Sequence, residues 1–109
     1  MLIVSKYGEI SLTRGDTARL TVDITDDEDR VYEVKEDDVV TLTVKKNYED
    51  KEALIEKKVT GSNSFHIKPE DTKGLEFGKY KYDVQVTTVD GDNYTVIEDR
   101  VFNITKEVG

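Results

Sequence analysis

The segment from Lys79 to Val89 alternates between two kinds of side chain, and this alternation most constrains the fold. Tyrosine, valine and threonine occupy the even positions from Tyr80 to Thr88, while the odd positions from Lys79 to Thr87 are charged or polar. A period of two with one apolar and one polar face is typical of a half-buried antiparallel strand. Asp90-Gly91 follows, a pair that suits a two-residue type I′ turn because both central residues need positive φ. The sequence therefore predicts a long β-hairpin ending near Ile104.

Two other segments, Thr17–Thr25 and Val39–Lys46, show the same alternation. Each must bury one face, so together with the hairpin they predict a core between two sheets. The expected core residues are Leu20, Val22, Leu42, Val44, Tyr82, Val84, Val86 and Phe102.

The rest of the chain adds shorter elements. We expect a broken first strand in Leu2–Val4 and Glu9–Leu12, a candidate extra strand in Val31–Val34, and a strand in Ser64–Lys68. Ala53–Thr60 could form a strand or a helical turn, and we favour a strand because Gly61-Ser62-Asn63 predicts a turn after it. Pro69–Lys73 predicts one helical turn, with proline at its first position and Gly74 at its end.

Short strands, frequent turns and little helix predict an all-β fold. We expect one domain over residues 1–109, an immunoglobulin-like antiparallel β-sandwich of about seven strands with one short helical turn. In that fold a tyrosine near the start of the penultimate strand bonds back to the preceding corner. Tyr80 has the right spacing, with Tyr82 where an immunoglobulin has cysteine. The other interpretation is that Tyr80 is simply a half-buried aromatic residue.

Composition narrows the functional classes. The chain has 109 residues, a net charge of −8 and no cysteine, so disulfides and thiol chemistry are excluded. The negative charge disfavours nucleic-acid partners. Leu2-Ile3-Val4 is the one apolar run near the start, and it is too short for a signal peptide or a membrane span. We expect a soluble chain without a membrane partner or a secretion signal.

No residue pattern predicts catalysis. His66 lies between Phe65 and Ile67, so it faces solvent if they face the core, and Ser62 and Ser64 nearby do not make a triad. No phosphate-binding glycine loop is present. We therefore expect neither enzymatic activity, nor a cofactor, nor a small-molecule substrate.

Two further motifs resemble known binding motifs, but ordinary loop and turn chemistry explains both. The acidic segment from Asp23 to Asp38 matches no calcium loop, so we expect no tightly bound metal. Calcium at Asp26, Asp27 and Asp29 is the one ion worth testing. Arg14-Gly15-Asp16 spells an integrin-binding tripeptide, but Gly-Asp is also ordinary turn chemistry, and we interpret it as a turn.

Three longer segments carry a family resemblance: ISLTRGDTARLTVDI, DVVTLTVKK and SFHIKPEDTKGLEFGKYKYDVQVTTVDGDNYTVIEDRVFNIT. In order and spacing they resemble the small N-terminal β-domain of phage baseplate upper proteins, and similar short prophage proteins of Gram-positive bacteria. The resemblance implies a virion structural protein, made in the cytoplasm of the bacterial host, that docks onto other phage tail or baseplate subunits. Baseplate upper proteins continue into further regions whereas this sequence stops at Gly109, so a stand-alone adaptor or decoration subunit is expected.

Three functional classes remain open: a virion adaptor, a carbohydrate-binding or adhesion module, and a cytoplasmic enzyme or regulator. The absence of tryptophan disfavours the second. For the first, the uncharged segment Leu2, Ile3, Val4 is the candidate docking segment, because an unprotected edge strand invites pairing with another chain. The expected partner is another phage structural subunit or a second copy of the chain. The alternative is that Leu2 and Val4 only complete the chain's own core.

Overall fold

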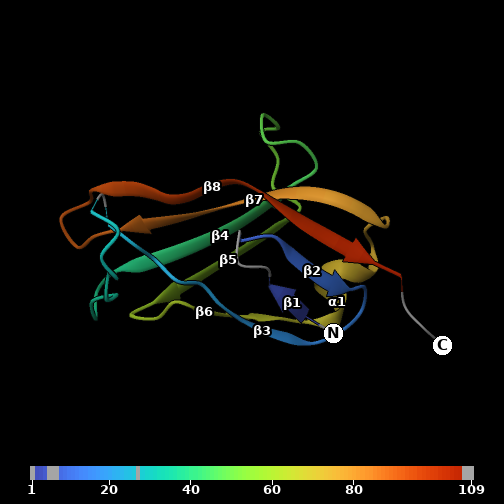
Figure 1. Ribbon diagram of the computed structural model, residues 1–109, viewed down its shortest axis with the longest axis horizontal. Helices are drawn as coiled ribbons and strands as arrows, with labels where there is room; N and C mark the ends of the chain where they lie inside the picture. The colour runs from blue at the N-terminus through green and yellow to red at the C-terminus, as the bar shows by residue number, and fades with distance from the viewer. Residues whose placement is uncertain (1, 5–7, 27, 107–109) are drawn as a thin grey trace.

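The computed structural model describes residues 2–4, 8–26 and 28–106, except for the side chain of Ile3. Its elements are β1 (Leu2–Val4), β2 (Ile10–Thr13), β3 (Ala18–Thr21), β4 (Val39–Lys45), β5 (Ile55–Thr60), β6 (Ser64–Ile67), α1 (Pro69–Lys73), β7 (Gly78–Thr87) and β8 (Asn93–Thr105). The all-β class with one short helical turn is confirmed (Figure 1).

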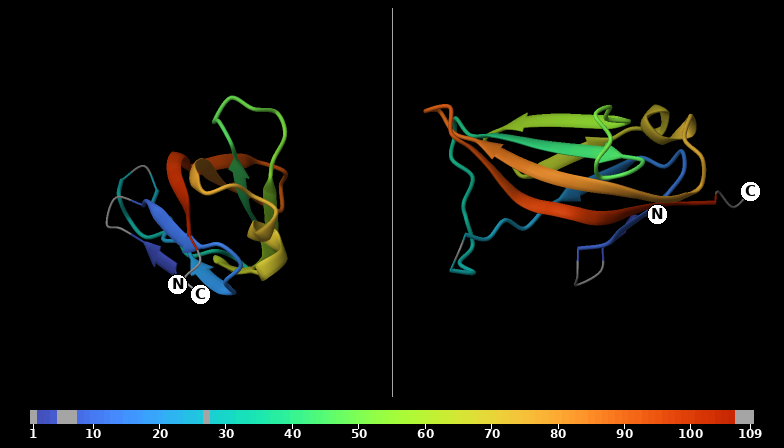
Figure 2. Two further views of the ribbon diagram at one scale, coloured as in Figure 1. Left: turned by 90° about the vertical axis from the view of Figure 1, so that its right-hand side faces the viewer. Right: turned by 90° about the horizontal axis from the view of Figure 1, so that it is seen from above.

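The strands form two sheets of very unequal width. The large sheet has the order β1-β2-β8-β7-β4-β5, and the small sheet contains β3 and β6. Strands β4, β7 and β8 are neighbours in one sheet, and β3 and β6 form the other. This is the arrangement of an immunoglobulin-like sandwich. One strand pair departs from the expected antiparallel pattern, because β2 runs parallel to β8. In the left view of Figure 2, β3 and β6 lie across the interior of the molecule from β7 and β8.

The core lies between the sheets and contains all eight residues expected from the sequence. Val84 and Leu42 are fully buried cross-strand neighbours in β7 and β4. Phe65 and Ile67 of β6 close the core from the small sheet. Ile10, Leu12 and Ile104 extend it along the parallel pair of strands. The alternation in the sequence therefore predicts the correct faces.

The tyrosine corner is present. The Tyr80 hydroxyl donates a hydrogen bond to the Glu76 carbonyl at 2.7 Å, and Tyr80 is buried. Tyr82 also faces the core, with its ring edge-on to Phe102 at 6.3 Å between centroids. Its hydroxyl donates to the Gly8 carbonyl. Two tyrosines of one strand thus fix β7 to the chain before it and to the segment leading into β2.

The hairpin turn differs from the expected two-residue type I′ turn. The loop has three residues, Val89-Asp90-Gly91, because Gly91 N–H donates to the Thr88 carbonyl and Thr88 N–H donates to the Asp92 carbonyl. Only Gly91 has positive φ, at 86°. This is a three-residue hairpin loop with a glycine in the left-handed position. Asp90-Gly91 indicated the location of the turn correctly but not its length.

Three strand boundaries also differ from expectation. The third strand pairs only over Ala18–Thr21, although the buried alternation continues through Val22 and Ile24. Val31–Val34 is not a strand and contributes a single bridge between Thr25 and Val31. The Ala53–Thr60 segment is a strand from Ile55 onward. Hydrogen bonding to a neighbour, which the sequence does not show, sets these limits.

The helical turn α1 forms where proline and acidic residues predicted it. Asp71 accepts a hydrogen bond from Lys68 N–H at 2.8 Å, which satisfies a free donor at the start of the helix. Asp71 also pairs with the Lys57 ammonium at 2.7 Å, which links α1 to β5. In the described part of the chain, no helix is both long and apolar enough to cross a membrane.

We expect Leu42→Ala to lower the free energy of unfolding by about 2–4 kcal/mol, because the vacated volume lies in a close-packed core. Urea denaturation of the variant and the parent measures the difference. Thr41→Ala, in the same strand on the outer face, serves as the control and should cost much less. Equal losses in the two variants would contradict the assigned faces.

We expect Tyr80→Phe to cost about 1 kcal/mol, since it removes the hydroxyl that satisfies the Glu76 carbonyl while keeping the ring. Thermal and urea unfolding would measure this loss. Tyr94→Phe is the matched control, because the Tyr94 ring is largely exposed. An unchanged stability for Tyr80→Phe would remove the structural role assigned to the corner.

Candidate docking surfaces

The candidate docking segment is the edge strand β1 of the large sheet. It pairs antiparallel with β2, with Leu2 opposite Leu12 and Val4 opposite Ile10. Leu2 is half-buried and packs against the core, whereas Val4 is 50% exposed. The segment therefore completes part of the core and also presents an uncharged edge. The opposite edge strand, β5, instead carries Lys57 and Lys58, which discourage pairing with another chain.

A groove that the sequence did not predict runs along the first half of β8. Of the residues of β8, only Phe102–Thr105 pair with strand β2. Between Asn93 and Val101, β8 therefore has a strand partner on its β7 side only, among the described residues. Two adjoining cavities of about 670 and 730 Å³ lie between this edge and the segment that continues β3. They share Thr25, Thr95 and Val96, and we call them together the β8 groove.

Two irregularities in β8 decide which side chains face the β8 groove. Tyr82 pairs with Arg100, Val84 with Ile97 and Val86 with Tyr94. Successive pairs are therefore two residues apart along β7 but three residues apart along β8. Such bulges re-aim side chains and often occur at functional edges. Because paired residues share a face, Tyr94, Ile97 and Arg100 all lie on the core-facing side.

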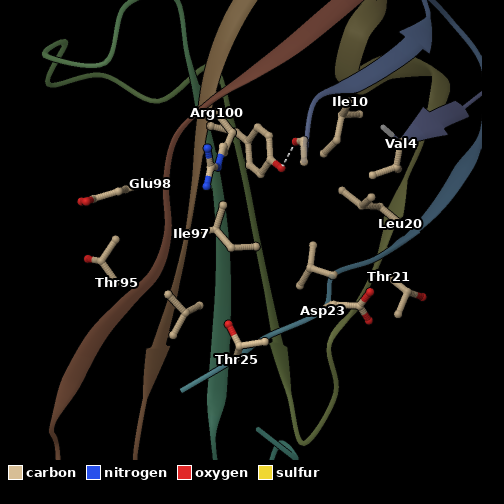
Figure 3. Close-up of a pocket in the computed structure, with 14 residues that line it drawn as sticks. Val4, Ile10, Leu20, Thr21, Asp23, Thr25, Thr95, Ile97, Glu98 and Arg100 are labelled. Atoms are coloured by element: carbon tan, nitrogen blue, oxygen red, sulfur yellow. Dashed lines mark hydrogen bonds between the residues drawn. The ribbon is translucent and has the colours of Figure 1, made fainter. Parts of the chain in front are cut away.

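Figure 3 shows the half of the β8 groove around Arg100. Ile97 and Arg100 point into the cavity, whereas Thr95 and Glu98 point away from it. Leu20 and Val22 face Ile97, and the three side chains form the apolar floor of the cavity. Asp23 follows Val22 in the lining and lies well apart from Arg100 in Figure 3. The result is a cleft with an apolar floor and one cation at its end.

Arg100 is notable because it has no ion-pair partner among the residues that the structure describes. Its guanidinium lies near Tyr82, whose pKa is raised by burial although the charge of Arg100 opposes that shift. Gly8 lies above the same two side chains, and an added Cβ there would lie 3.5 Å from the Tyr82 hydroxyl and 3.8 Å from Arg100. The hydrogen bond from the Tyr82 hydroxyl to the Gly8 carbonyl holds this part of the chain against one end of the β8 groove.

Asp38 is a buried carboxylate that organises the loop before β4. It is 2% exposed and accepts hydrogen bonds from the Tyr32 hydroxyl and from Lys35 N–H. The Tyr32 bond is the main reason that the pKa of Asp38 is lowered, with the Lys35 amide second. The same bond raises the pKa of Tyr32. Since Tyr32 lines the second cavity, Asp38 positions one wall of the β8 groove.

Asp26 and Glu28, in the loop that precedes Tyr32, also serve the fold. The Asp26 carboxylate accepts hydrogen bonds from Glu28 N–H, Arg30 N–H and Arg30 Nε at 2.9–3.1 Å. Arg30 also pairs with Glu28 at 3.2 Å. Asp27 lies outside the described residues, and the described residues contain no cluster of acids or histidine that could hold a metal. The carboxylate of Asp26 is thus committed to closing its own loop.

His66 is exposed on β6 between the buried residues Phe65 and Ile67, as expected. The nearby serines are engaged elsewhere. Ser62 Oγ accepts from Ser64 N–H at 3.1 Å, and Ser64 Oγ hydrogen-bonds the Thr21 hydroxyl at 2.7 Å. The described residues therefore give His66 no oriented nucleophile.

Arg14-Gly15-Asp16 is a structural turn. The Arg14 guanidinium lies 4.1 Å from the centroid of the Phe77 ring and donates to the Leu75 carbonyl. Gly15 N–H donates to Thr72 Oγ1 at 2.8 Å, and Asp16 N–H donates to the Thr13 carbonyl. The tripeptide therefore connects the β2–β3 turn to α1 and the tyrosine corner.

The comparisons give no relative from which a function could be inferred. The chain matches no protein-family model, no curated protein and no solved structure.

Asp38 predicts a specific loss of stability in acid. A carboxyl whose pKa is lower in the folded than in the unfolded chain stabilises the fold above the unfolded pKa, about 3.9. That stability is lost as the pH falls from there through the folded pKa. We expect Asp38→Asn, measured by urea denaturation from about pH 6 to pH 2, to flatten this part of the profile. Asp37→Asn is the control, since Asp37 is exposed, and an identical profile for the parent and Asp38→Asn would contradict the role.

Proposed function

We propose that this chain is a structural docking domain of a phage or prophage virion, which binds tail or baseplate subunits without catalysing a reaction. The observation that carries the proposal is the edge strand β1, which is uncharged and leaves Val4 half exposed at the end of a six-stranded sheet. An edge of this kind presents backbone donors and acceptors to a second chain. The resemblance to baseplate domains supplies the particle in which that chain is expected.

The arrangement of polar groups supports binding over catalysis. The polar side chains that are best placed for chemistry form hydrogen bonds that stabilise the fold. Asp38 and Asp26 accept hydrogen bonds within their own loops. The hydroxyls of Tyr80 and Tyr82 donate to backbone carbonyls. The partner is another subunit of the particle or a second copy of this chain, and its place of action is the virion.

The virion assignment is tested on particles. We expect the chain to co-purify at fixed stoichiometry with tail structures when the prophage is induced and particles are banded on a density gradient. Quantitative mass spectrometry across the gradient provides the measurement. Presence of the chain only in the soluble lysate, with intact tails lacking it, contradicts the proposal.

The docking segment is tested by adding charge to its edge. We expect Val4→Lys to abolish or strongly weaken incorporation into particles while lowering the melting temperature little, because Val4 is half exposed and a lysine opposes edge pairing. Val89→Lys is the matched control, since Val89 is 74% exposed in the hairpin turn. Deleting Met1 to Val4 separates the remaining alternative: loss of incorporation at unchanged melting temperature supports docking. A collapse of the melting temperature shows that the segment is mainly core.

A further inference from the structure

We propose that the β8 groove is a second binding surface, which takes an extended peptide segment of a partner protein carrying one carboxylate side chain spaced from apolar ones. It deepens the proposed docking function by adding a recognition site distinct from the β1 edge. Three side chains carry the inference: Tyr94, Ile97 and Arg100, which the bulges of β8 turn to the same side.

The spacing of these three side chains fits an extended peptide. Their partners on β7, Val86, Val84 and Tyr82, are two residues apart, which is the side-chain repeat of one face of any β-strand. An extended peptide lying along β8 therefore presents residues i, i+2 and i+4 to Arg100, Ile97 and Tyr94. Because of the bulges, the three side chains of the cleft have the same spacing as the side chains on one face of an extended peptide.

The chemistry of each position sets the preferred side chain. Arg100 has no carboxylate partner within the described part of a chain of net charge −8, so an incoming carboxylate is complementary to it. Ile97 and the facing Leu20 and Val22 form an apolar floor. Tyr94 is 55% exposed at the far end and offers a flat ring. The expected ligand pattern is acidic, any residue, apolar, any residue, apolar or aromatic.

The cleft favours a peptide over a sugar for two reasons. Its floor between Leu20, Val22 and Ile97 is aliphatic, and its exposed ring, Tyr94, lies at one end, whereas a sugar site needs a ring platform at its centre. The backbone of β8 from Asn93 to Val101 has a strand partner on only one side among the described residues. Its free groups can bond to an adjacent peptide backbone.

The test uses synthetic peptides and the intact chain. The probes are the capped peptides Glu-Thr-Val-Thr-Tyr and its reverse, Tyr-Thr-Val-Thr-Glu, which cover both chain directions. Each is titrated to about 1 mM against isotope-labelled protein, and amide chemical shifts are followed. We expect shifts centred on Tyr94–Arg100 and Leu20–Thr25 for one direction. Replacing Glu with Gln in that peptide should weaken binding roughly twofold to fivefold.

A charge exchange identifies the contact with Arg100. Arg100→Gln should remove the difference between the Glu and Gln peptides, and Arg100→Glu should prefer a Lys peptide over the Glu peptide. Arg19→Gln is the matched control, because Arg19 is exposed on the outer face of β3 and the same charge is lost there. Unchanged melting temperatures verify that each variant is folded.

The remaining outcomes overturn the proposal. These are no shift with any peptide, shifts outside the β8 groove, equal binding of Glu and Gln peptides, or shifts of the same amides by sialyllactose without any by peptide. The last result would assign the cleft to an acidic sugar instead. Failure of the virion test leaves peptide binding intact, and failure here leaves incorporation through β1 intact, so the two proposals fail separately.

Discussion

The fold depends on the pairing register of β7, because this strand has neighbours on both sides and carries the centre of the core. It pairs with β4 and β8, and its residues Tyr80, Tyr82, Val84 and Val86 are all buried. Since a shift of one residue would turn each of them to the outer face, the register is strongly specified. The hydroxyls of Tyr80 and Tyr82 add directional restraints to that apolar preference, because each has a single carbonyl partner.

The unequal widths of the two sheets explain the remaining features. Two strands cannot cover the inner face of a six-stranded sheet, so the segment that follows β3, described at residues 22–26 and 28–34, covers part of it without forming a strand. Its side chains Val22 and Ile24 are buried, and Tyr32 and Val34 pack against the core. Backbone outside a ladder needs other partners, and Asn63 bonds Val22 while Asp38 fixes Tyr32 and Lys35. The β8 groove lies between this covering segment and the edge of β8.

Gly61 shows how closely the loop before β4 packs against the rest of the chain. Gly61, in the β5–β6 turn, has φ of 68° and donates its N–H to the Asp38 carbonyl at 2.8 Å. An added Cβ there would come within 2.9 Å of the Glu36 carbonyl oxygen. The turn between two strands and the loop before β4 therefore pack backbone against backbone. Asp38 connects this contact to Tyr32, and so to the wall of the second cavity.

Periodicity in the sequence predicted the buried faces, whereas features that depend on strand pairing escaped it. The faces of Leu42, Val84 and Phe102 were predictable from alternation alone, and the corner spacing made Tyr80 a candidate. The parallel β2–β8 pair and the groove could not be read in this way, because they depend on which edges meet. The sequence did contain a signal for one bulge, because the polar run Glu98-Asp99-Arg100 interrupts the apolar alternation of β8. In the structure, Asp99 of this run adopts a positive φ of 49°. Asp38 carried no signal, since a buried aspartate and an exposed one look alike in a run of acids.

The two proposed surfaces differ in how they would recognise a partner. The β1 edge offers backbone groups and small apolar contacts, so it selects weakly among partner sequences. The β8 groove adds an aromatic ring, an aliphatic floor and a guanidinium at strand spacing, which discriminate by side chain. The bulges that turn Tyr94, Ile97 and Arg100 inward also disturb the regular ladder, which protects that edge from indiscriminate strand addition. A docking domain with both surfaces could join a particle through one edge while selecting a specific segment with the other.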